Sequence, residues 1–143
     1  QAEGAKNARL QSTERSAVVS GDWEWQFRVV DPDGDLHIER ELWHLSEQND
    51  DITGTYERIV ERTRPSGVFV CNGSAQTQSV TRYNLRGQRF GDKLTITEID
   101  FAVSPGPCET TQRRLDRYRG TLTPDGQLIL NWSGGTQILR RKK

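Results

Sequence analysis

The chain has 143 residues, of which 32% are hydrophobic and 28% are charged, so it is one domain with a small core. Its 20 basic and 20 acidic residues cancel, which gives no global reason to expect nucleic acid or an anionic membrane as a partner. No apolar run reaches the roughly 18 residues of a transmembrane helix, and recurring aromatic and β-branched residues argue against disorder.

The first 20 residues are small and polar and form no apolar face. Residues 1–20 therefore predict a loosely ordered N-terminal arm or tether, ahead of a barrel domain over residues 21–143. The chain contains no methionine, so we expect that Gln1 is not the translational start and that a leader was removed or the chain was cut. A lipid anchor on the residue before Gln1 is compatible with such an arm.

From Gly21 onward the hydrophobic period is close to two, which is typical of β-strands. Nine segments carry this pattern: 22–30, 36–45, 51–63, 67–71, 78–87, 93–103, 113–122, 127–132 and 136–141. The segments 31–35 and 123–127 between them both contain Pro-Asp-Gly, which suits tight turns. Short strands joined by short turns predict an all-β fold, a closed antiparallel up-and-down β-barrel of about eight strands.

The alternation changes phase twice, and a β-bulge is the usual cause of such a change. Leu36 and Ile38 share one phase, whereas Trp43 and Leu45 lie on the other, so we expect an extra residue within 39–41. A second change follows Thr97-Glu98 and predicts another bulge there. Bulges let a sheet coil tightly enough to close.

Cys71 and Cys108 are the only two cysteines. In a small domain with little core, they favour a disulfide in an exported protein over a metal or redox site. The alternative is a pair of free thiols in a cytosolic protein. We expect export, with the protein periplasmic, anchored at the outer membrane or secreted.

Gly21-Asp22-Trp23 opens the first strand and Arg140 lies on the last. This pairing resembles the calycins, which comprise the lipocalins, the fatty-acid-binding proteins and the avidins. The resemblance covers residues 20–141 and implies that Trp23 packs across the closed end of the barrel with Arg140 over its ring, an arrangement in which a guanidinium stacks on an indole. Arg141 is an equally good partner for Trp23.

The segment Ile52–Glu57, "ITGTYE", resembles the third-strand "LTGTYE" of avidin-like proteins and implies that Tyr56 points into the barrel. Two polar ligand contacts of the avidins correspond to Trp25 and Val29 here, so we do not expect biotin binding. Trp25 either lines the cup or fills it. On size, the chain also resembles the small bacterial inhibitors of secreted metalloproteases, in which an N-terminal arm enters the protease.

A barrel of this size either holds one small ligand or is packed solid. Alternation places Trp25 and Phe27 on one face of the first strand, and Tyr56 and Arg58 on one face of the third. We predict a polar-tipped ligand pocket in which Arg58 or Arg82 faces Glu98, because buried charges persist only when paired. The alternative is a register in which these arginines point outward. The predicted ligand-binding residues are Trp25, Phe27, Tyr56, Arg58, Arg82 and Glu98.

No pattern predicts catalysis, a cofactor or a metal site. His37 and His44 lack further ligands at suitable spacing, and no nucleophile–base motif or phosphate loop is present. The arginine-rich segment with Arg113, Arg114, Arg117 and Arg119 is interrupted by Asp116 and split between two faces, so we expect ion pairs there and not a nucleic-acid surface.

Acidic residues are in excess between positions 35 and 62, and basic residues after position 105. Cross-strand ion pairs or a basic docking patch both account for this asymmetry. We expect a non-catalytic exported barrel that binds a small amphipathic or anionic molecule, or an envelope component, in or at the mouth of the cup. The alternative function is a protein–protein module, such as a protease inhibitor or an envelope-complex subunit, that acts through residues 1–20 and the basic C-terminal region.

Overall fold

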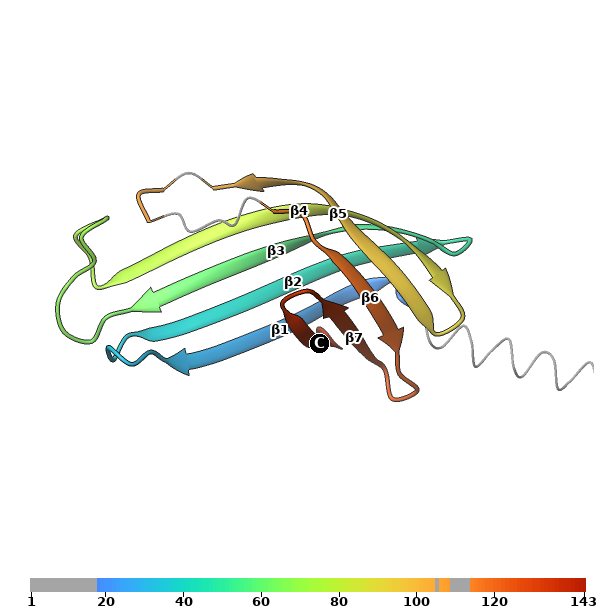
Figure 1. Ribbon diagram of the computed structural model, residues 1–143, viewed down its shortest axis with the longest axis horizontal. Helices are drawn as coiled ribbons and strands as arrows, with labels where there is room; N and C mark the ends of the chain where they lie inside the picture. Colours follow the sequence, from blue (N-terminus) through green and yellow to red (C-terminus); the bar gives the residue numbers. More distant parts are fainter. Residues whose placement is uncertain (1–17, 105, 109–113) are drawn as a thin grey trace, which may run out of the picture.

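The computed structural model describes residues 18–104, 106–108 and 114–143. These residues form a closed barrel in which each strand pairs antiparallel with the next and β8 returns to β1, so the predicted up-and-down barrel is confirmed (Figure 1). The strands are β1 (Gly21–Val30), β2 (Leu36–Gln48), β3 (Asp51–Thr63), β4 (Gln76–Phe90), β5 (Lys93–Val103), β6 (Arg117–Leu122), β7 (Gln127–Trp132) and β8 (Gly135–Arg141). The architecture is consistent with a calycin-like fold.

The strands differ in length, and this difference makes the two ends of the barrel unlike. Strands β2, β3 and β4 have 13 to 15 residues, whereas β6, β7 and β8 have six or seven. Strand β1 pairs with β8 only at Trp23 and Glu24. The barrel is therefore continuous near Gly21, while the far ends of β1–β4 extend past β6 and β7 as a curved sheet (Figure 1).

Trp23 closes the continuous end, as the calycin resemblance implies. Its side chain is fully buried, and its indole Nε1 donates a hydrogen bond to the Val19 carbonyl at 2.8 Å. The guanidinium over its ring belongs to Arg141, whose Cζ lies 4.3 Å from the ring centroid. The choice of Arg140 is wrong, because Leu139 is buried and Arg141 shares its face, so alternation turns Arg140 outward.

The boundary between arm and barrel lies earlier than predicted. Val19 is fully buried beside Trp23, and its N–H donates to Glu47 Oε2 at 3.0 Å. The Ser20 hydroxyl accepts a hydrogen bond from the Glu47 N–H, and Arg141 donates to the carbonyls of Val18 and Ser20. Residues 18–20 thus belong to the closed end of the barrel. The rest of the predicted arm, residues 1–17, lies outside the described residues.

Of the two predicted bulges, one is confirmed. The β4–β5 register shifts between Asn84, which pairs with Asp100, and Leu85, which pairs with Glu98, so Ile99 is the extra residue. The bulge at 39–41 is wrong, because β2 pairs with β1 and β3 in one unbroken register over its whole length. The phase change in β2 has another cause. Glu39 and Glu41 face the barrel interior, so polar side chains occupy the inward positions in this part of the strand.

Two glycines let neighbouring strands approach each other closely. A Cβ at Gly54 would lie 2.2 Å from the His44 carbonyl oxygen, and one at Gly87 would lie 2.0 Å from that of Thr95. Both are backbone atoms of the adjacent strand, so a side chain at either position would force the strands apart.

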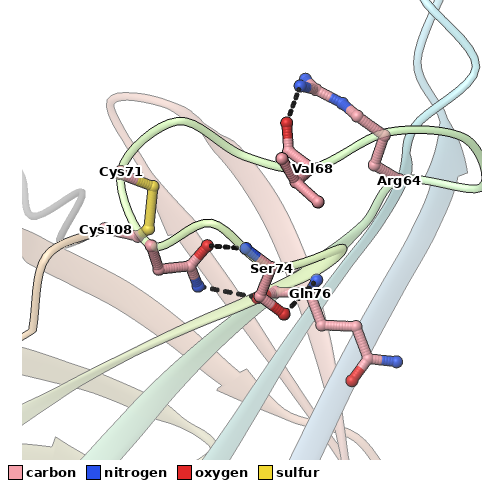
Figure 2. Close-up of a disulfide and its surroundings, with 7 residues drawn as sticks. Arg64, Val68, Cys71, Ser74, Gln76 and Cys108 are labelled. Carbon is pink, nitrogen blue, oxygen red and sulfur yellow. Dashed lines mark hydrogen bonds between the residues drawn. A yellow bond between two sulfur atoms is a disulfide. The ribbon is translucent and has the colours of Figure 1, made fainter.

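The disulfide between Cys71 and Cys108 is present, with a Cα–Cα distance of 5.5 Å. It joins the β3–β4 connection to the β5–β6 connection, outside the barrel wall (Figure 2). The predicted strand at 67–71 is wrong, because this segment forms only one bridge, Phe69 to Ser74. Arg64 anchors the loop through the Val68 carbonyl at 3.0 Å (Figure 2) and the Asp35 carboxylate at 2.9 Å.

Ion pairs engage five of the acids between positions 35 and 62. Their partners lie on β2–β4 or directly after β3, not in the basic C-terminal region: Asp35–Arg64, Glu39–Arg58, Glu47–Arg89, Glu57–Arg82 and Glu61–Arg40. Among the described residues, no helix is long and apolar enough to cross a membrane.

Candidate functional site

The register of the long strands arranges the inward side chains in rows. One row is aromatic: Trp23 pairs with Trp43, Trp43 with Tyr56, Tyr56 with Tyr83 and Tyr83 with Phe101. The rings of Trp43 and Tyr56 stack at 4.1 Å, and those of Tyr56 and Tyr83 at 4.4 Å. Such cross-strand contacts stabilise a sheet, and this row separates the apolar closed end from a polar half.

The next row toward the open end is polar, since Trp25 pairs with Glu41, Glu41 with Arg58 and Arg58 with Thr81. Above the aromatic row lies a half-open cavity of about 380 Å³. Six aromatic side chains line it: Trp25, Phe27, Tyr56, Tyr83, Tyr118 and Trp132. The other lining residues are Glu39, Glu41, Arg58, Arg114, Asp116, Gly134, Thr136 and Gln137. Its size suits a small organic molecule.

Glu41 is the most deeply buried carboxylate in the cavity wall, at 4% exposed. Its Oε1 accepts a hydrogen bond from Trp43 Nε1, and its Oε2 accepts one from Gln137 Nε2, both at 2.9 Å. Burial raises the pKa of Glu41 to about 6, although both hydrogen bonds oppose the shift. The carboxylate is therefore charged at neutral pH, at a cost in stability.

That cost predicts the effect of Glu41→Gln. The folded-state pKa lies above the ordinary value of 4.5, so the contribution of Glu41 to stability is fully present below pH 4.5 and is lost as the pH rises through 6. The loss is about 2 kcal/mol. The substituted glutamine carries no charge, and the Gln137 amide can turn to accept its N–H. We expect the variant to be about 2 kcal/mol more stable than wild type at pH 8 and equal to it at pH 4.

Urea unfolding at both pH values measures this difference. Glu24→Gln is the matched control, because Glu24 is exposed on the neighbouring strand and its replacement removes no buried charge. Equal stability of Glu41→Gln and wild type at pH 8 would mean that the buried charge costs nothing.

A second buried carboxylate, Glu98, contacts two of the tyrosines that line the cavity. Its Oε2 accepts hydrogen bonds from the hydroxyls of Tyr56 and Tyr118, the latter at 2.7 Å, and its Oε1 accepts the Asp116 N–H at 2.7 Å. Burial raises the pKa of Glu98 despite these donors. Burial also raises the pKa of both tyrosines, with Glu98 adding to the shift, so both remain protonated donors. This cluster ties β3, β5 and β6 together.

Arg58 contributes a positive charge to the wall, but the charge is paired. Arg58 Nη2 lies 2.9 Å from Glu39 Oε1, and His37 Nε2 lies 3.0 Å from the same oxygen. Burial pushes the pKa of Glu39 upward, and the contacts with His37 and Arg58 outweigh it, so the pKa is lowered overall. Glu39 is thus held as a charged partner of Arg58.

Comparisons of the chain with protein-family models, curated proteins and solved structures give no significant match. The function must therefore be argued from the geometry of this cavity.

Four of the predicted site residues, Trp25, Phe27, Tyr56 and Arg58, line one cavity. Glu98 lies behind its wall, hydrogen-bonded to Tyr56. Arg82 lies elsewhere. Its side chain is 71% exposed and pairs with Glu57 on the outer face at 2.8 Å, because Tyr83 and Thr81 take the inward positions on β4. The pairing of Arg58 or Arg82 with Glu98 is wrong, and Glu39 is the partner of Arg58.

The prediction missed Glu39, Glu41 and Gln137, three residues central to the cavity. A signal for the two acids is present in the sequence: they share the phase of Trp43 and Leu45, so uninterrupted alternation turns them inward. Gln137 lacks such a signal, because one polar residue in a short strand suits either face. Among the described residues, no cluster of three or more His, Cys, Asp or Glu side chains could hold a metal.

Proposed function

We propose that this barrel is a non-catalytic exported binding protein that holds a small amphipathic molecule in its open end. One observation carries the proposal: a half-open cavity of about 380 Å³ has six aromatic side chains in its wall and a buried amide oxygen, Gln137 Oε1, without a hydrogen-bond partner among the described residues. Ligand sites combine an apolar, aromatic wall with a few polar groups that fix orientation, and a buried polar atom without a partner is costly.

A binding role is favoured over catalysis because the charged groups near the cavity are engaged in hydrogen bonds. Glu98 accepts from two tyrosines and a backbone N–H, and Glu39 is paired with Arg58. Neither carboxylate is placed as a free acid or base. The disulfide is compatible with export. A periplasmic, outer-membrane-anchored or secreted location remains part of the proposal.

The alternative, a protein–protein module that acts through the N-terminal arm, depends mainly on residues 1–17. These lie outside the described residues, so the alternative remains a prediction from sequence.

Binding of prodan, a neutral naphthalene ketone whose emission shifts to the blue in an apolar site, tests the proposal. We expect prodan to bind the wild-type protein and Phe27→Ala to weaken this binding by about tenfold, since a buried aromatic contact contributes about 1.4 kcal/mol or more. Ile138→Ala is the matched control. Phe27 is 45% exposed within the cavity wall and Ile138 is 46% exposed outside that wall, so the control should bind prodan as wild type does. Absence of binding, or equal binding by the Phe27 variant, would overturn the proposal.

A further inference from the structure

Two neighbouring groups in the buried part of the cavity wall have free hydrogen-bond acceptors. Gln137 is 7% exposed and lines the cavity, and its Oε1 has no partner within the described part of the chain. Its Nε2 donates to Glu41 Oε2 at 2.9 Å. Each Glu41 oxygen accepts one hydrogen bond from the described residues, and a carboxylate oxygen can accept two. Gln137 Oε1 and the Glu41 carboxylate are thus neighbouring acceptors, both able to take another donor.

The charges in the wall do not balance. Both arginines of the cavity are paired, Arg58 with Glu39 at 2.9 Å and Arg114 with Asp116 at 3.2 Å. Glu41 forms no ion pair with any described residue; its direct partners are an indole N–H and an amide. Arg58, opposite Glu41 on the next strand, attracts this carboxylate without forming an ion pair with it. The charge left over in the cavity is therefore negative and buried, and a buried charge without a directly bonded partner of opposite sign is unfavourable.

We propose that the ligand is a small amphipathic amine, whose protonated amino group binds Glu41 and Gln137 Oε1 while its apolar body lies against the aromatic wall. This inference rests on the proposed function and adds the ligand class. An ammonium group has three donors and no acceptor, so it suits the neighbouring free acceptors of Glu41 and Gln137. The nearby indole and phenol rings also attract a cation through their faces.

Two other ligand classes fit less well. A carboxylate would place a second negative charge beside Glu41, and the arginines that could offset it are already paired. A neutral alcohol could donate to Gln137 Oε1 but would leave the Glu41 charge without a counter-ion. Of the two molecules expected from sequence, the amphipathic one is retained and the anionic one is not.

Three ligands with the same phenylalkyl body separate these classes: 4-phenylbutylamine, 4-phenylbutanol and 4-phenylbutyrate. Calorimetry at about pH 8 keeps Glu41 and the ammonium group charged. We expect the amine to bind at least about tenfold more tightly than the alcohol, because hydrogen bonds between charged groups are stronger than neutral ones. The acid should bind most weakly. An alcohol or acid that binds as tightly as the amine would overturn the inference.

Two variants then test which side chains cause the preference for the amine. Glu41→Gln and Gln137→Leu should each weaken amine binding by about tenfold, and Glu41→Gln should remove the preference for the amine over the alcohol. Glu24→Gln removes an exposed acid from the adjacent strand and should behave as wild type. Selectivity that survives in Glu41→Gln would refute the assigned role of Glu41. The comparison of the three ligands on the wild-type protein decides the inference even where a variant does not fold.

The outcomes distinguish this inference from the proposed function. If prodan and the alcohol bind in a Phe27-dependent way but the amine binds no more tightly than the alcohol, the cavity is a ligand site and the amine assignment fails. If prodan does not bind, or binds the Phe27 variant equally well, the proposed function fails and the inference fails with it.

Discussion

Trp43→Ala is expected to lower the free energy of unfolding by about 3–5 kcal/mol, the range for removal of a buried tryptophan. Trp43 is fully buried. Its ring stacks on Tyr56 at 4.1 Å and meets Tyr118 edge-on at 5.4 Å, so its removal opens a cavity in the middle of the aromatic row. Since small domains are stable by about 5–15 kcal/mol, this single change removes a large part of the total.

Urea unfolding at neutral pH measures the effect. Trp43→Phe should cost less, because a ring remains in the stack, but it deletes the indole donor to Glu41 and leaves that carboxylate with one fewer hydrogen bond. Phe90→Ala is the control, since Phe90 is 69% exposed and its loss should change stability little. A cost below about 1 kcal/mol for Trp43→Ala would show that the aromatic row is not the centre of the core.

Removal of the disulfide by Cys71→Ala with Cys108→Ala is expected to cost up to about 4 kcal/mol, the entropic contribution of a cross-link over a loop of this size. The cysteines are 37 positions apart, and the cross-link acts by restricting the unfolded chain. The bridge joins two connections outside the barrel wall (Figure 2). The core itself should therefore keep its structure while the unfolded state gains freedom.

Two measurements check this prediction together. The urea midpoint should fall, while the near-ultraviolet circular dichroism of the buried tryptophans should remain that of wild type. Reduction of the wild-type protein should reproduce the stability of the double variant. A change in the tryptophan signal would mean that the bridge supports the barrel directly, and a stability loss below about 1 kcal/mol would contradict the entropic account.

Prediction from sequence worked where apolar side chains mark one face of a strand. Trp23 and Tyr56 are buried as expected. The bulge after Thr97-Glu98 is present, because an extra residue in a strand shifts the alternation of its apolar side chains. The predicted bulge at 39–41 is wrong, because it depended on polar side chains facing outward, and the acids of this segment face inward. In a barrel whose open half is lined with charge, inward residues are not apolar, so hydrophobicity no longer marks the inner face.

Local alternation and turn chemistry were enough to predict the closed barrel, and two cysteines in a small domain favoured the disulfide. The place of Trp23 at the closed end followed from the resemblance to the calycins. The polar groups that meet in the cavity could not be predicted, because they come from strands far apart in the chain. Glu41 and Gln137 are 96 positions apart in sequence, and they meet because closure brings β8 beside β1, which carries β2 on its other edge. The choice of Arg141 over Arg140, and the outward position of Arg82, depend in the same way on register, since a shift of one residue exchanges the two faces of a strand.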